Sequence, residues 1–183
     1  MLTIVVGPMF SGKSSSLHRY VSRALRSKKT VKVFVPVIDV RSKGQITTHN
    51  GMSLADLGVT PTAVTDSQTI YQSVKDNPPG LLVIDEAQFF DPQLPHWVEK
   101  LSAHTHIVAA GLDMTSEGVP FTSPMGDLLC LADQVIKLTA ICQCGGEATR
   151  TACLVEKVGS VLVGGVGQYV PMCRGCWDVH RAQ

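Results

Sequence analysis

Residues 2–14, which decide the fold, read LTIVVGPMFSGKS. The apolar run at residues 2–6 predicts a short buried strand, and the residues that follow Lys13 have the spacing of an amphipathic helix. Between the two, Gly7 to Ser14 satisfies the pattern G-x-x-x-x-G-K-[ST] of a P-loop. Its glycines let backbone N–H groups curl around a phosphate at a helix N-terminus, so the stretch predicts a nucleotide site on an α/β fold.

The P-loop supplies most of the expected contacts to the nucleotide. Lys13 can bridge the outer phosphates, and the Ser14 hydroxyl can bind Mg²⁺. The residues predicted to form this part of the site are Gly7, Pro8, Met9, Phe10, Ser11, Gly12, Lys13 and Ser14.

A second signal is the apolar run at residues 81–84, which ends in the adjacent carboxylates Asp85 and Glu86. Asp85 is expected to hold the water shell of the magnesium ion, and Glu86 can accept the proton of an attacking hydroxyl or orient a water molecule. These motifs alone indicate only a P-loop NTPase, a class that includes kinases, ATPases and helicases. A helicase motor normally couples two such domains, whereas this chain has room for one.

Apolar runs recur along the chain between segments with helical spacing. The runs are at 2–6, 31–35, 81–84, 107–110 and 135–138, and the expected helices are at 14–27, 66–75 and 92–103. This alternation predicts a doubly wound α/β domain of the RecA-like P-loop class, with a mostly parallel sheet and flanking helices, over residues 1–140. Residues 141–183 have glycines and paired cysteines in short polar segments, which predicts a small zinc-ribbon-like lobe.

Composition excludes several kinds of partner. The chain has 16 basic and 15 acidic residues and no polybasic run, so we expect no nucleic-acid partner. No apolar stretch approaches the roughly 20 residues that span a bilayer, and the first residues lack the features of an export signal. We therefore expect a cytoplasmic enzyme without a membrane partner.

Four of the six cysteines form two close pairs, at Cys142 and Cys144 and at Cys173 and Cys176. In a reducing compartment this clustering favours a metal over disulfides, and four thiolates suit a structural, tetrahedral Zn²⁺. The first pair has a gap of only one residue, which leaves free thiols, or a fourth ligand such as Cys153 or His180, as alternatives. Cys130, among leucines, is expected to be a buried apolar residue.

Taken in order, the motifs resemble those of the thymidine kinases of the cytosolic and bacterial P-loop type. The resemblance covers nearly the whole chain, through segments at 7–14, 39–41, 48–51, 84–90, 111–113, 137–140 and 164–169. It implies that Glu86 deprotonates the sugar 5′-hydroxyl for attack on the γ-phosphate of ATP. It also implies that Asp39 and Arg41, together with Asp85 and Gln88, lie near the phosphates and magnesium. Without the resemblance, Asp39 and Arg41 could be a solvated loop ion pair.

The same resemblance implies a pocket for the thymine ring, with the backbone of residues 160–164 on its polar edge. The implied pocket residues are Met9, Phe89, Leu112, Phe121, Thr151, Ser160, Val161, Leu162, Val163, Gly164 and Tyr169. Without it, Met9 and Leu112 would more often be core residues and Tyr169 an ordinary strand aromatic. Ser116 stands where the family commonly has an aromatic residue, a change that could loosen nucleoside selectivity and leaves deoxyuridine open as a second substrate.

The implied ligands are ATP with Mg²⁺, thymidine and a structural Zn²⁺, and the implied assembly is a homotetramer inhibited by dTTP. Two rival functions remain, a P-loop ATPase acting as a motor or switch and an idle nucleotide-binding module with a zinc lobe. An ATPase would release phosphate without a nucleoside. The idle module would bind ATP and be indifferent to the loss of Glu86.

Overall fold

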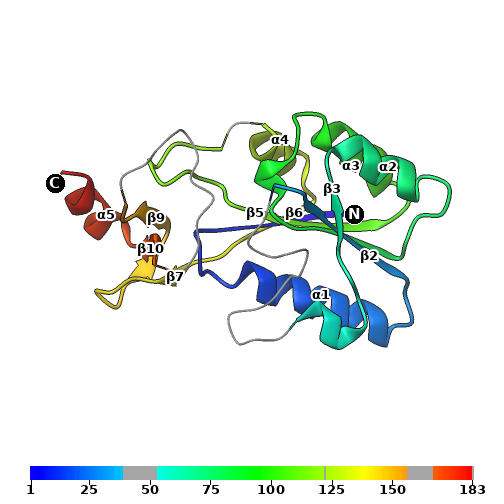
Figure 1. Ribbon diagram of the computed structural model, residues 1–183, viewed down its shortest axis with the longest axis horizontal. Coiled ribbons are helices and arrows are strands. Elements are labelled where there is room, and N and C mark those ends of the chain that lie inside the picture. The colour runs from blue at the N-terminus through cyan, green and yellow to red at the C-terminus, as the bar shows by residue number, and fades with distance from the viewer. Residues whose placement is uncertain (39–52, 122, 156–166, 183) are drawn as a thin grey trace.

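The computed structural model describes residues 1–38, 53–121, 123–155 and 167–182, which are built around a six-stranded sheet (Figure 1). The strands are β1 (Leu2–Val6), β2 (Val31–Pro36), β3 (Thr62–Val64), β4 (Leu81–Ile84), β5 (His106–Gly111) and β6 (Gln134–Lys137). Their order is β3-β2-β4-β5-β1-β6, and every neighbouring pair is parallel. The predicted parallel α/β sheet is confirmed, while β3 was not predicted because three residues carry too little pattern.

Helices cover both faces of this sheet (Figure 1). One face carries α1 (Lys13–Arg26) and the short 3₁₀ helix η1 (Leu54–Leu57), and the other carries α2 (Ser67–Val74), α3 (Leu94–Ser102) and α4 (Met125–Leu131). Side chains alternate along β1, because Ile4 belongs to the core under α2 to α4 and Val5 to the core under α1. The central strands β1, β4 and β5 are therefore buried on both faces, as in a doubly wound fold, whereas the edge strand β6 is mostly exposed.

The helix boundaries follow from local chemistry. Asp66 caps α2 by accepting a hydrogen bond of 2.8 Å from the Thr69 N–H, in the role expected of it. Helix α4 was not predicted, since it is short and contains Gly126, a poor helix former. It turns Leu128 into the core and leaves Cys130 exposed, so the expected burial of Cys130 is wrong.

The chain beyond the sheet forms two small antiparallel ribbons and a helix. These elements are β7 (Ala140–Ile141) with β8 (Glu147–Ala148), β9 (Arg150–Cys153) with β10 (Tyr169–Met172), and α5 (Arg174–Arg181). They lie together at one end of the molecule, beyond the carboxyl ends of the sheet strands (Figure 1). The division into two domains near residue 140 stays a prediction.

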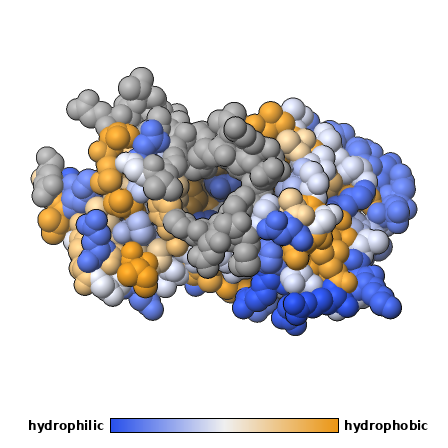
Figure 2. Space-filling model, turned by 60° about the horizontal axis from the view of Figure 1, so that its bottom comes forward, coloured by the Kyte–Doolittle hydropathy of each residue, from blue (hydrophilic) through white to orange (hydrophobic). Residues whose placement is uncertain are grey.

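The outer side of α1 faces solvent. Its Leu17 and Val21 are buried, whereas Arg19, Arg23 and Arg26 are exposed, and the surface over this helix is largely hydrophilic (Figure 2). In the described parts of the chain, no helix combines the length and the hydropathy needed to cross a bilayer.

Candidate nucleotide-binding and metal-binding sites

The loop between β1 and α1 depends on two glycines. Gly7 has φ 152°, and a Cβ added there would lie 2.5 Å from the carbonyl oxygen of Leu138 and 2.8 Å from the hydroxyl of Ser11. Gly12 has φ 89°, in the left-handed region, directly before α1 begins. Only glycine adopts these conformations readily, so the two positions explain why the loop can curl ahead of the helix.

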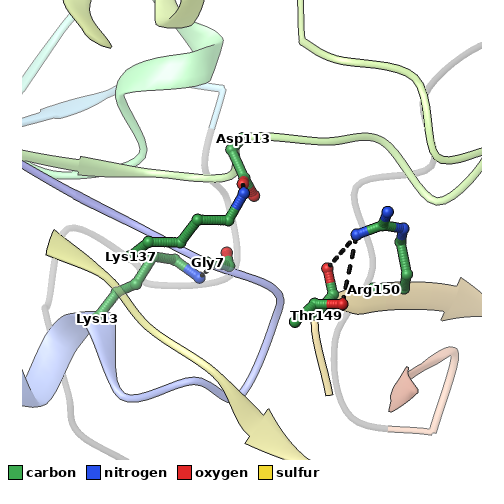
Figure 3. A network of polar contacts seen from close by, with 6 residues as sticks. All are labelled: Gly7, Lys13, Asp113, Lys137, Thr149 and Arg150. Atoms are coloured by element: carbon green, nitrogen blue, oxygen red, sulfur yellow. Dashed lines mark hydrogen bonds and ion pairs between the residues drawn. The ribbon is translucent and has the colours of Figure 1, made fainter. Parts of the chain in front are cut away.

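Lys13 lies over this loop. Its ammonium group donates a hydrogen bond of 3.1 Å to the carbonyl of Gly7 (Figure 3). It donates a second one, of 2.8 Å, to the carbonyl of Pro8. The side chain therefore folds back from the first turn of α1 across the loop, where its charge can meet phosphate oxygens.

A pocket opens beside the loop, at the carboxyl ends of β1, β4 and β5. It is lined by Met9, Phe10, Ser11, Gly12, Lys13, Ser14, Ser15, Asp85, Glu86 and Leu112. Ligands of open α/β sheets bind at this edge. The structure thus brings the P-loop and the two carboxylates together, and it places Met9 and Leu112 on the pocket wall rather than in the core.

An unusual backbone conformation directs both carboxylates into this pocket. Neighbouring residues of a strand normally point to opposite faces. Glu86 instead has φ 50° and ψ 42°, a left-handed conformation that is uncommon for a residue other than glycine. The chain turns there into the 3₁₀ helix η2 (Ala87–Phe89), while the carboxylate of the largely buried Asp85 accepts a 2.9 Å hydrogen bond from the Glu86 N–H.

Behind Glu86 lies the buried side chain of Gln88. Its amide nitrogen donates to the Glu86 carboxylate at 2.5 Å, and its amide oxygen accepts from the Leu112 N–H at 3.0 Å. A Cβ added to Gly111 would lie 2.6 Å from that amide oxygen, so glycine leaves room for this bond. The expected contact of Gln88 with ATP or magnesium stays a prediction.

The residues expected around the thymine ring lie in several places. Thr151 of β9 accepts a 3.0 Å hydrogen bond from the Met9 N–H and so ties the small ribbons to the P-loop. Tyr169 is buried in β10 opposite Cys153, and Phe121 packs against the core below α2 to α4. Phe89 is half-buried in η2.

Several expected site residues lie outside the described residues. They are Asp39, Arg41, Ser160, Val161, Leu162, Val163 and Gly164. His49, which had no assigned role, also lies outside them. Apart from His49, these residues were expected to contact the thymine ring or the phosphates, and those contacts stay predictions.

Sequence reasoning assigned no role to an ion pair near the P-loop. Lys137, at the end of β6, contacts the carboxylate of Asp113 at 2.7 Å (Figure 3). It pairs with Val6 of β1, the residue directly before the P-loop. The Asp113 side chain is 9% exposed, so the neighbouring ammonium compensates a nearly buried charge. Both residues lie in segments that resemble the family, and that resemblance is the signal from which the pair could have been predicted.

The four paired cysteines meet in space. Their sulfur atoms all lie within 4.8 Å of one another, and those of Cys144 and Cys173 are 3.7 Å apart. Zn–S bonds of about 2.3 Å in a tetrahedron place sulfur atoms about 3.8 Å apart, which fits this spacing. Gly145, with φ 85°, completes the tight turn that the one-residue gap needs. Among the described residues, neither of the alternative ligands, Cys153 or His180, belongs to this cluster.

The thiols of this cluster influence one another strongly. Hydrogen bonds from the backbone N–H groups of Cys173 and Cys144 lower the pKa of Cys142 to about 6. Hydrogen bonding with the thiols of Cys173, Cys144 and Cys142 raises the pKa of Cys176 to about 12. Four thiolates so close together repel each other, and a cation among them removes that repulsion. The cluster could therefore hold a metal ion.

Helix α5, which starts at the cluster, also contacts the segment after β5. Cys173 caps the helix, and Trp177 on its next turn is buried and donates a 3.3 Å hydrogen bond to the Ser116 carbonyl. The guanidinium group of Arg181 lies 4.6 Å from the centre of the Trp177 ring. Nothing in the sequence indicated this contact, because the two residues are 61 positions apart.

Comparisons with known proteins agree on one family. The family model described as thymidine kinase matches residues 1–177. A thymidine kinase of Bacteroides fragilis strain YCH46 is 37% identical over 180 residues, which cover 97% of this chain and 86% of that protein. A thymidine kinase of Deinococcus deserti is 38% identical over 187 aligned positions, which cover 94% of this chain and 92% of that protein.

Proposed function

The chain belongs to the thymidine kinase family, whose reaction is the phosphorylation of thymidine in nucleoside salvage, and we propose that it transfers the γ-phosphate of ATP to the 5′-hydroxyl. The observation that carries this proposal is the single pocket wall shared by the P-loop, Asp85, Glu86 and Leu112. It offers a phosphate cradle, a base and an apolar surface within reach of one another.

The residues act in one step of phosphoryl transfer. The backbone N–H groups of the P-loop, of which Pro8 has none, and the ammonium of Lys13 hold the phosphates. Glu86 accepts the proton of the 5′-hydroxyl as its oxygen attacks the γ-phosphorus. Asp85 and the Ser14 hydroxyl, which line the same pocket, are the residues that would hold Mg²⁺. Bound there with ATP, the ion neutralises phosphate charge. Arg41 would offset negative charge on the transferring group.

For the cysteine cluster we propose structural Zn²⁺ held by Cys142, Cys144, Cys173 and Cys176. The sulfur spacing and the four-thiolate donor set support that ion, and a closed set of ligands leaves no position for substrate. Its role would be to fix α5 and the ribbons against the P-loop domain. The expected homotetramer, the inhibition by dTTP and the cytoplasmic location stay predictions.

The test is ADP formation by the zinc-loaded protein with ATP and Mg²⁺, offered thymidine, deoxyuridine, deoxycytidine or deoxyadenosine in turn. We expect turnover with thymidine, with the 5′-monophosphate identified by mass. Equal ADP formation without any nucleoside would contradict the proposal and favour the ATPase.

A substitution separates the kinase from an idle nucleotide-binding module. Glu86→Gln should keep ATP affinity and lower kcat about a hundredfold or more, because the general base is lost. Glu99→Gln, on the exposed side of α3, is the matched control and should keep full activity. Wild-type turnover by Glu86→Gln would exclude Glu86 as the base.

A further inference from the structure

We propose that Gln88 is a positioning residue, which holds the carboxylate of Glu86 and the backbone of Leu112 in one arrangement and so sets the base and the nucleoside wall together. The inference rests on the proposed kinase function and deepens it. Gln88 acts through its neighbours, since the pocket is lined by Glu86 and Leu112 and the Gln88 amide lies behind them.

The two hydrogen bonds allow only one orientation of the Gln88 amide. A backbone N–H can only donate, so the group facing Leu112 is the amide oxygen. An ionised carboxylate can only accept, so the group facing Glu86 is the amide NH₂. Each end of the side chain is therefore matched to its partner, and Gln88 is 6% exposed, which keeps water from replacing either bond.

Glu86 needs such a contact more than an ordinary strand residue does. Its backbone is left-handed, and its half-buried side chain leaves the sheet at the edge of an open pocket. A glutamate side chain can adopt several rotamers, and a hydrogen bond to its carboxylate favours those that keep the bond. Gln88 restricts that choice from two residues further along the chain.

Leu112 connects this contact to the next strand. It directly follows β5, and its N–H reaches the Gln88 amide oxygen in the space that Gly111 leaves beside it. A displacement of either strand end therefore moves the base and the apolar wall together. Since misplacement of reacting groups by about 1 Å can cost about a hundredfold in rate, this linkage matters for catalysis.

Two substitutions of Gln88 separate its two contacts. Gln88→Glu keeps an oxygen for the Leu112 N–H but replaces the donor to Glu86 with a second carboxylate. We expect kcat to fall about tenfold to a hundredfold, with KM for thymidine within about twofold of wild type. Gln88→Leu removes both bonds, so it should lower kcat similarly and also raise KM for thymidine.

Two further variants distinguish positioning from a loss of stability. Gly111→Ala leaves Gln88 intact but crowds its amide oxygen, so it should lower kcat as the Gln88 variants do. Val98→Ala, in the core of α3, should lower the melting temperature with kcat unchanged. In a Glu86→Gln background, Gln88→Leu should add little further loss of kcat. Wild-type kcat in both Gln88 variants, or an equal loss in Val98→Ala, would overturn the proposal.

Amide hydrogen exchange, measured by NMR on the free protein, tests the positioning role without any reaction. The Leu112 N–H should exchange faster in Gln88→Leu than in wild type, Gln88→Glu or Val98→Ala. Faster exchange combined with no thymidine phosphorylation by wild type would refute the proposed function and still support the contact. Thymidine turnover by wild type with unchanged Leu112 exchange in Gln88→Leu would overturn the positioning role alone.

Discussion

Gly118 lies directly against the ring of Trp177, and replacing it with Ala tests how helix α5, which starts at the cysteine cluster, is joined to the rest of the protein. An added Cβ would lie 2.4 Å and 2.7 Å from two carbons of that ring, closer than packed carbon atoms approach. The ring cannot easily move away, because it is buried and its N–H donates a hydrogen bond to the Ser116 carbonyl. Gly118 also has φ 76°, which disfavours any residue with a Cβ.

The expected cost has two parts. The left-handed backbone costs about 1 kcal/mol for alanine, and overpacking of a buried ring costs about 1–3 kcal/mol more. A total of about 3 kcal/mol lowers the melting temperature of a chain of this size by about 6–12 °C. Scanning calorimetry of the zinc-loaded protein measures this shift.

Gly58→Ala is the matched control for Gly118→Ala. Gly58 has φ 71°, but no atom lies within 4 Å of an added Cβ, so the variant carries only the backbone cost of about 1 kcal/mol. Its melting temperature should therefore fall by about 2–4 °C. Trp177→Leu should make Gly118→Ala nearly harmless beyond that backbone cost. Equal shifts in the two alanine variants would refute the reasoning from the Trp177 ring.

Three further predictions concern the P-loop, the cysteine cluster and the carboxylate of Asp91, which accepts hydrogen bonds from Ser67 and from the Gln93 N–H. Gly7→Ala should abolish detectable ATP binding in calorimetric titration, since its Cβ would lie 2.5 Å from a backbone carbonyl oxygen. Cys173→Ser should lower the zinc content and the melting temperature together, while Cys130→Ser, outside the cluster, should change neither. Partial burial raises the pKa of Asp91, but hydrogen bonds from Ser67 and from backbone N–H groups lower it by more, so the net shift is downward. The stabilisation from Asp91 is thus present above about pH 4 and is lost as the pH falls through the pKa of the folded state. In Asp91→Asn, the melting temperature should therefore decline less steeply below about pH 4 than in wild type.

Strong local patterns made the central fold predictable. Residues 81–84 are all apolar, and residues 2–6 are apolar except for Thr3, because their strands are covered on both faces. Such runs can be recognised without knowledge of their neighbours. Strand β3 and helix α4 lack that signal. Residues 62–64 become a strand only by pairing with β2, and Gly126 weakens the helical pattern around it.

The candidate site was predictable where one motif carries its chemistry and not where distant residues complete it. The P-loop and the acidic pair are each short contiguous motifs at the end of a strand, so their meeting in one pocket could be predicted. The bond between Trp177 and Ser116 joins residues far apart in the chain and uses a backbone carbonyl, which every residue has. No sequence pattern marks such an acceptor.

Local rules are also broken at the proposed base itself. Glutamate disfavours the left-handed backbone that Glu86 adopts, and that conformation is maintained by what surrounds it. The Asp85 carboxylate accepts the Glu86 N–H, and the Gln88 amide holds its side chain. These two interactions, which help to hold the strained residue, also help to place its carboxylate in the pocket. A substitution that relaxes Glu86 would then release the base as well, which is why strain and catalytic geometry are expected to be lost together.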